Sequence, residues 1–116
     1  MSKKIVLDYR ADKNLFDTTA KYWAGTIDKT KKTQVRNFYD KVLELESKAK
    51  KEEWEDILPF VKMLNSKVAY GVTRNVVSSE FEDMINQCVS QVKNIDDLKL
   101  FKLFFEAVLG FFKGSK

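Results

Sequence analysis

The residues best suited to chemistry in this sequence are lysines and arginines in two windows that contain no acidic residue. From Lys29 to Tyr39 the basic residues are Lys29, Lys31, Lys32 and Arg36, and from Ile57 to Ser79 they are Lys62, Lys67 and Arg74. The acidic residues concentrate in 40–56 and 80–97. Ammonium and guanidinium groups without neighbouring carboxylates attract phosphates, so the two windows indicate a surface for a nucleic-acid backbone.

The spacing within each window predicts which basic residues share a face of a helix. Lys67 and Arg74 are seven residues apart, so they fall on nearly the same face if one helix spans both. Lys29, Lys32 and Arg36 follow at steps of three and four, or else they crowd the start of a helix, whose free N–H groups bind phosphate. The alternative is a set of ordinary solvated lysines, with an ion pair between Arg36 and the carboxylate four residues later.

Residue types that many enzymes need are absent from the sequence. There is no histidine, which excludes Ser-His-Asp and Cys-His triads, imidazole acid–base catalysis and His-ligated zinc. Cys88 is the one cysteine, so thiolate-rich metal sites and an intramolecular disulfide are excluded as well. The four glycines match neither a dinucleotide-binding loop nor a Walker loop. The sequence therefore predicts a protein that is not an enzyme and that uses no cofactor and no metal.

A hydrolase built on paired carboxylates is the remaining catalytic alternative. The densest acidic residues are Glu52, Glu53, Glu55 and Asp56. They belong to the Lys/Glu-rich stretch 46–56, whose mixed charges are typical of a solvated helix end and its connection. The alternative is therefore weaker than a binding role.

The basic windows need a scaffold, and the periodicity of the apolar residues predicts an all-α one. At 116 residues the chain fits one domain with one hydrophobic core. Apolar residues recur at helical spacing after Thr33, a suitable N-cap, again around Pro59, and again after Ser79, which begins a capping box with Glu82. We therefore expect a compact helical bundle at 33–116, with about four to five helices in the whole chain.

Residues 1–32 are the least regular part of the sequence. Leu15, Ala20 and Trp23 are spaced for a short helix, with Gly25 as its stop. The lysines and the Thr/Asp/Gly-rich exit of this region suit a mobile N-terminal arm instead. The predicted organisation is thus an N-terminal arm or short helix at 1–32, followed by the bundle at 33–116.

The last predicted helix, at 98–112 with a cap at Asp96 or Asp97, is apolar on both of its sides. Such a helix is either central to a core or shared with a partner. It is too short to span a membrane, and its charged residues form no broad polar face, so a core helix is favoured over a membrane-surface helix. The single cysteine and the absence of an apolar signal region after Met-Ser-Lys-Lys predict a cytoplasmic protein without membrane contact.

Three segments resemble the signatures of the small subunit of type III-A CRISPR effector (Csm) complexes. Residues 33–39 (TQVRNFY) resemble its Thr-x-Gln/Thr-Gln-Ile-Arg-x-Phe-Tyr signature, and residues 67–74 (KVAYGVTR) resemble Lys-Leu-Ala-Tyr-Ala-x-x-Arg. Residues 104–113 (FFEAVLGFFK) resemble the Phe-Phe-Glu-Ala-hydrophobic-x-x-Tyr-x-Lys ending. Ser66 stands where the family often has proline, Phe112 replaces a common tyrosine, and the first 30 residues match no part of the pattern.

The resemblance implies a non-catalytic helical subunit that stacks, several copies per complex, along the duplex of guide RNA and target RNA. The implied protein partners are the ribonuclease-bearing backbone subunit, the large polymerase-like subunit and further copies of the chain. By position in the motifs, Arg36, Lys67 and Arg74 are implied to face RNA, with Lys32 beside the first motif. Lys29, Lys31 and Lys62 join them from charge clustering alone. The guide then reads sequence, and the protein binds backbone and shape.

The other interpretation is a helical protein-interaction or oligomerisation module without direct RNA contact. It is motivated by the helix at 98–112, because aromatic apolar surfaces often bury against partners. Both interpretations predict self-association, so they differ in whether the basic residues are needed for binding.

Overall fold

The computed structural model describes residues 3–114, and in that range it contains α-helices and no β-strand. The helices are α1 (Thr18–Thr26), α2 (Lys32–Ala49), α3 (Trp54–Thr73), α4 (Ser79–Ser90) and α5 (Ile95–Phe111). The predicted all-α bundle of four to five helices is therefore confirmed. Residues 1, 2, 115 and 116, at the outer ends of the predicted arm and bundle, lie outside the described residues.

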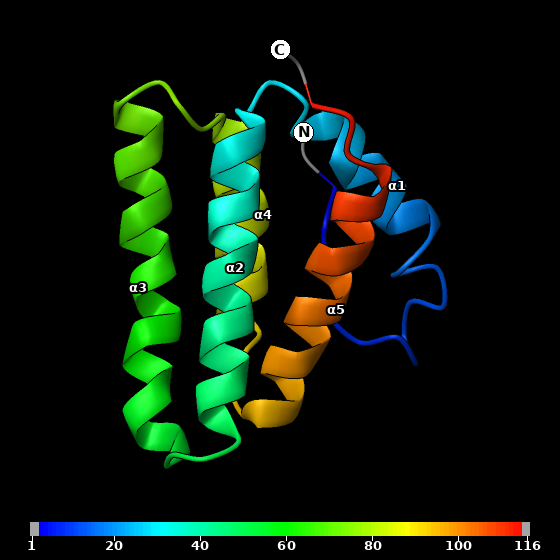
Figure 1. Cartoon of the computed structure of the whole chain (residues 1–116). Coiled ribbons are helices and arrows are strands. Elements are labelled where there is room, and N and C mark those ends of the chain that lie inside the picture. The colour runs from blue at the N-terminus through cyan, green and yellow to red at the C-terminus, as the bar shows by residue number, and fades with distance from the viewer. Residues whose placement is uncertain (1–2, 115–116) are drawn as a thin grey trace.

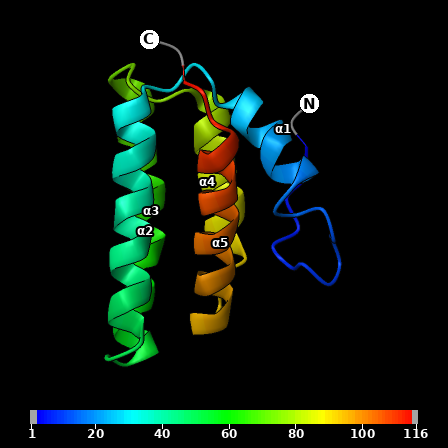
Figure 2. The same ribbon diagram turned by 45° about the vertical axis from the view of Figure 1, so that its right-hand side comes forward.

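The four longer helices run nearly side by side, and α1 packs across one of them. α2 lies between α3 and α5, α3 also packs against α4, and α1 lies against α5 (Figure 1). The starts of α2 and α4 and the end of α3 meet at one end of the bundle (Figure 1). Figure 2 shows α1 and the N-terminal segment on the α5 side of the molecule, away from α3.

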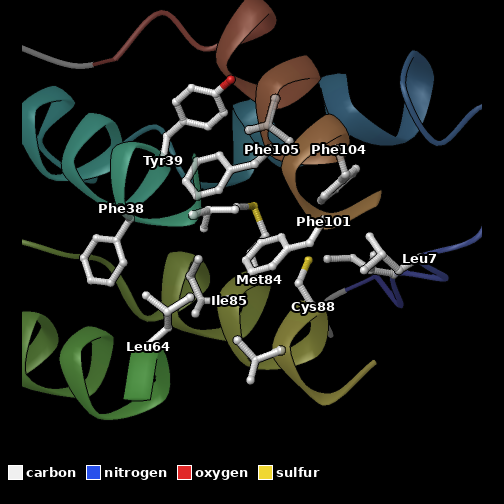
Figure 3. Packing of buried hydrophobic residues seen from close by; sticks show 14 of the residues in the cluster. Leu7, Phe38, Tyr39, Leu64, Met84, Ile85, Cys88, Phe101, Phe104 and Phe105 are labelled. Atoms are coloured by element: carbon white, nitrogen blue, oxygen red, sulfur yellow. The ribbon is translucent and has the colours of Figure 1, made fainter. Parts of the chain in front are cut away.

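The core is centred on the aromatic residues of α5. Phe101 and Phe105 stack with ring centroids 6.1 Å apart. Phe105 also meets Tyr39 of α2 at 5.5 Å and Phe81 of α4 at 6.0 Å, both edge to face. Figure 3 shows Tyr39 of α2 close to Phe105 and Phe101 of α5. Edge-to-face aromatic pairs stabilise a fold beyond the burial of their area. Because Phe101 and Phe105 are fully buried, the predicted core position of α5 is confirmed.

The N-terminal region packs on the bundle through an extended segment, a turn and α1. Ile5 and Leu15 are buried, and so is Trp23 of α1. Two glutamines of α4 hold the extended segment: Ile5 N–H donates to Gln87 Oε1 at 2.7 Å, and Gln91 Nε2 donates to Ile5 O at 2.8 Å. The predicted short helix is present as α1, and the segment before it pairs its backbone with side-chain amides, which periodicity does not reveal.

Two predicted helix caps are wrong by one to three residues. Ser78, not Ser79, caps α4, because the Ser78 backbone is extended and its Oγ accepts from Phe81 N–H at 3.1 Å. Asn94, rather than Asp96 or Asp97, caps α5 through a 2.8 Å bond from Asp97 N–H. An N-cap needs extended backbone at the residue itself, and the sequence offers several suitable side chains in a row.

The helix starting at Lys32 and the stretch 46–56 also differ from expectation. Lys31 occupies the N-cap position of α2 in place of the predicted Thr33, and it makes no side-chain cap bond within the described residues. Glu46 was expected to be solvated but is 5% exposed, and its carboxylate lies 3.5 Å from Lys50 Nζ. Glu46 shares the inward face of α2 with Val42 and Ala49, which explains its burial.

Candidate nucleic-acid interface

The first basic window occupies the turn before α2 and the start of that helix. Lys29, Lys31 and Lys32 are exposed, and the first turn of α2 carries no acidic residue. The leading N–H groups of a helix lack intrahelical partners, and the peptide dipoles make this end positive. Lysines placed there need an anion to offset their repulsion from the dipole. The start of α2 therefore suits a phosphate group.

The second basic window reaches the same end of the bundle through the last turn of α3. Thr30, completely buried, ties the two chain segments together: its Oγ1 accepts from Ser78 N–H at 3.0 Å and lies 2.8 Å from Ser78 Oγ. Lys31 N–H donates to Val76 O at 3.4 Å, two residues after Arg74. The start of α2 and the end of α3 lie at one end of the molecule (Figure 1), and Lys31 and Arg74, which belong to different windows, cap these two helix ends.

Acidic residues limit this surface on one side. α4 also begins at this end, and its first turn carries Glu80 and Glu82. Those carboxylates suit the positive start of their own helix. The basic surface therefore does not extend over the first turn of α4.

Lys67 lies in a shallow groove between α2 and α3. Asn37, Phe38, Lys41 and Leu64 line the groove with it, around a volume of about 200 Å³. Lys41 also borders a second depression further along the same two helices. The other residues that line it are Leu45, Lys48, Glu52, Asp56, Ile57 and Phe60. The charge along this side of the bundle therefore changes from basic near Lys67 to mixed near the start of α3.

Arg36 lies on the opposite flank of α2 from this groove. Its Nε is 3.5 Å from Asp40 Oδ1, and its guanidinium lies 5.9 Å from the centroid of the Tyr39 ring. Tyr39 Oη donates to Glu106 Oε1 of α5 at 3.4 Å, so this flank faces α5. Arg36 and Asp40 form the surface pair that the alternative interpretation expected. Both side chains are more than half exposed, so the pair is weak.

Lys62 lies on yet another side of α3. It borders a depression between α3 and α4 together with Asn65 and Lys93. Five residues separate Lys62 from Lys67, which rotates their side chains by about 140° around the helix. Lys62 and Lys67 therefore do not share a surface, although one acid-free window contains both.

The structure thus sorts the seven predicted residues into groups. Lys29, Lys31, Lys32 and Arg74 gather at one end of the bundle, Lys67 lies in the α2–α3 groove, and Arg36 and Lys62 occupy separate flanks. Sequence reasoning missed Lys41, which lines the groove beside Lys67. Its position four residues after Asn37, on one side of a predicted helix, is the signal that could have found it.

Other chemistry finds little support in the described chain. Residues 3–114 contain no group of three potential metal ligands of the His, Cys, Asp or Glu type. Burial raises the pKa of the Cys88 thiol, which keeps it protonated and unreactive. Within the same residues no helix is long and apolar enough to cross a membrane.

Comparison with known proteins gives a single finding. The family model Csm2 Type III-A matches residues 10–116, which is nearly the whole chain. No curated protein and no solved structure matches. The matched range contains the three resembling segments and also reaches into the N-terminal region. The chain therefore belongs to the Csm2 Type III-A family, and this membership makes it a small subunit of a type III-A Csm complex.

Proposed function

We propose that this chain is a non-catalytic subunit that binds the backbone of the guide RNA–target RNA duplex without reading its sequence. The observation that carries the proposal is the meeting of two basic windows, distant in sequence, at one end of the bundle. Lys31 and Arg74 belong to different windows, and the Thr30–Ser78 contact holds their segments together. Such a surface suits phosphates spaced along a duplex.

The proposed contacts are Lys29, Lys31, Lys32 and Arg74 at the end of the bundle and Lys67 in the groove. Arg36 and Lys62 contribute long-range attraction from their own flanks. A few phosphate contacts give weak, salt-sensitive binding for one copy, and several copies on one duplex raise the overall affinity through multivalency. The partners implied by the family, namely the backbone ribonuclease subunit and the large polymerase-like subunit, would then perform the catalysis.

The experiment compares two double variants with the same change of charge. Lys31→Glu/Arg74→Glu alters the proposed surface, whereas Lys51→Glu/Lys93→Glu alters exposed lysines at the other end of the bundle. Binding of a short RNA duplex is measured by fluorescence anisotropy over a salt series. We expect the first variant to lose most of its affinity and to reduce the slope of log K against log salt by about 2, while the control keeps its slope. Equal losses in both variants would refute a specific surface.

The surface that could support the protein-interaction alternative lies on α3 and not on α5. The residues of α5 that suggested it are buried inside this chain: Leu98, Phe101, Phe104, Phe105 and Val108. The exposed apolar residues lie on α3 instead, where Phe60, Met63 and Tyr70 are 51%, 45% and 64% exposed. A pull-down of partner subunits with and without ribonuclease separates the two functions. The alternative would be favoured if partner subunits stay bound after ribonuclease treatment and also bind the Lys31→Glu/Arg74→Glu variant.

A further inference from the structure

A cavity lies between the N-terminal segment and the first half of α5, away from the proposed RNA-binding surface. Its volume is about 380 Å³, which is in the range of small-molecule sites. α5 begins at the end of the bundle opposite to the starts of α2 and α4 (Figure 1). The lining of the cavity combines an aromatic ring, two leucines and four charged groups, which is chemistry that the proposed function does not use.

One wall of the cavity is a turn that follows the extended N-terminal segment. Asp8 closes this turn twice: its carbonyl oxygen accepts from Asp12 N–H at 2.9 Å, and its Oδ1 accepts from Arg10 N–H at 2.9 Å. Just before the turn, Leu7 is buried, and its N–H donates to Gln91 Oε1 of α4 at 2.8 Å. The wall is therefore anchored to the bundle and holds its side chains beside α5.

This turn presents an exposed aromatic ring to the cavity. Tyr9 is 47% exposed, and its ring centroid lies 6.3 Å from that of Phe16. The Arg10 guanidinium lies 5.5 Å from the centroid of the Tyr9 ring, so a cation and a ring enter the cavity together. Exposed aromatic rings stack with nucleobases, and this stacking tolerates any base because every base has a flat face.

The other wall belongs to one face of α5. The residues that form it are Asp96, Lys99, Leu100 and Leu103, at the helical steps of three, one and three. Leu100 and Leu103 are half-buried, because they lie on the apolar side of α5 that the core covers only in part. The two leucines therefore give the cavity an apolar surface in addition to the Tyr9 ring.

Four charged side chains surround these apolar surfaces. Arg10 and Lys99 are cationic, and Asp8 and Asp96 are anionic. Within residues 3–114, none of the four has an ion-pair partner within 4.0 Å. Guanidinium and ammonium groups bind phosphate, and a carboxylate accepts hydrogen bonds from ribose hydroxyls. A ligand that matches the whole lining therefore carries a flat ring, an anion and hydroxyl donors.

We propose that this cavity binds a ribonucleotide, which carries all three groups. The base packs between the Tyr9 ring and the two leucines of α5, and the phosphate binds Arg10 and Lys99. Asp96 accepts the ribose hydroxyls. It suits this role better than Asp8, whose Oδ1 already accepts from a backbone N–H of its own turn.

The site is independent of the proposed function and of the family match. Asp8 and Tyr9 precede residue 10, where the matched range begins, so family membership does not account for this cavity. The phosphates of a duplex and the basic end of the bundle play no part in the site. Two sources offer the required chemistry, namely a free mononucleotide and an unpaired nucleotide of an RNA strand.

The first experiment locates the ligand. The full chain, isotope-labelled and freed of RNA with ribonuclease, is titrated with AMP and followed by heteronuclear NMR. We expect saturable shifts at residues 8–10 and 96–103, with a dissociation constant below about 1 mM. Shifts confined to the start of α2 and the end of α3 would place AMP on the basic surface and overturn the proposal, as would the absence of shifts.

The second experiment removes the proposed contacts one at a time. Tyr9→Ala should raise the dissociation constant for AMP about tenfold, whereas Tyr70→Ala, at an exposed tyrosine of α3, should leave it unchanged. Lys99→Gln should raise it about fivefold, with Lys51→Gln as the matched exposed control. All these positions are exposed, and circular dichroism checks that the fold is kept. Equal effects in the cavity and control variants would overturn the proposal.

The third experiment tests the ribose contact and the source of the nucleotide. The unchanged chain should bind AMP about tenfold more tightly than deoxy-AMP, and Asp96→Ala should remove most of this difference. No preference for AMP would refute a ribonucleotide site. A short single-stranded RNA of the same base separates the two sources. Tighter binding of the strand at the same residues assigns the site to an unpaired RNA nucleotide, and equal or weaker binding assigns it to the free nucleotide.

A last variant separates this site from the proposed function. Lys31→Glu/Arg74→Glu changes only the basic end of the bundle, so it should bind AMP like the unchanged chain. Tyr9→Ala should likewise keep its affinity for duplex RNA. Loss of AMP binding in Lys31→Glu/Arg74→Glu would show that the nucleotide sits on the basic surface and would refute a separate site.

Discussion

Gly71 lies in the last turns of α3, where a methyl group would collide with Val77. A Cβ built on Gly71 lies 2.7 Å from Val77 Cγ2 and 3.1 Å from Val77 Cβ. Valine is stiff about χ1, and Val77 is 5% exposed. Its N–H also donates to Gly71 O at 3.3 Å, so neither the side chain nor the backbone can move away freely. Gly71→Ala should therefore destabilise the fold although alanine favours helices.

The expected magnitude follows from two opposing effects. Forcing a methyl group into a packed site costs about 1–3 kcal/mol, and the rigid neighbour places this case toward the upper part of that range. The higher helix propensity of alanine returns up to about 1 kcal/mol. The free energy of unfolding should fall by about 1–2 kcal/mol. With an m-value of about 2 kcal/mol/M, the urea midpoint should fall by about 0.5–1 M.

Urea unfolding followed by circular dichroism measures this change, and two further variants test its cause. Gly110 in α5 has no heavy atom within 4 Å of a built Cβ, so Gly110→Ala should be neutral or stabilising by up to about 1 kcal/mol. Val77→Ala removes Cγ2, the closest obstacle, at its own cost of about 2 kcal/mol but keeps Cβ, so in that background Gly71→Ala should cost clearly less. The explanation fails if Gly71→Ala stabilises the protein, or if its cost is unchanged when Val77 is alanine.

Two further predictions concern the N-terminal region and the alkaline stability. Leu15 is fully buried, so Leu15→Ala should lower the free energy of unfolding by about 2–5 kcal/mol in the same urea assay, whereas Phe16→Ala, at a partly exposed neighbour, should cost much less. A negligible cost at Leu15 would mean that this segment does not pack on the bundle in solution. Burial and the nearby Glu106 raise the pKa of Tyr39 above its ordinary value of 10.0. The unfolded chain therefore loses this proton first, so the contribution of Tyr39 to stability is complete below pH 10 and declines as the pH rises toward its folded-state pKa. Tyr39→Phe should make the alkaline loss of stability shallower, and identical pH profiles for the two proteins would contradict this.

Sequence reasoning succeeds where a single helix carries the whole pattern. Lys67 and Arg74 were expected on one face because seven residues nearly complete two helical turns, and both are exposed, in α3 and directly after it. Periodicity also led to the core position of the last helix. These predictions depend on spacing along one helix, which the sequence contains in full.

Predictions that needed a neighbouring segment were less successful. Ser79 and Ser78 are equally good caps by type, and the contact with Thr30, 48 positions away, engages Ser78. Glu46 resembles its solvated neighbours in type but falls on the inward face of α2. The segment around Ile5 has no period of its own and is held by glutamine side chains of α4.

The sequence by itself determined the helical class, the apolar stripes, the family and the two acid-free windows, because these are properties of residue type and of spacing within single elements. The tertiary structure decided which windows meet. It brings Lys31 and Arg74 to one end, turns Lys62 and Arg36 onto other flanks, and leaves Phe60, Met63 and Tyr70 of α3 exposed in the described chain. Relative positions of helices follow from packing between distant segments, and no spacing along one helix encodes them.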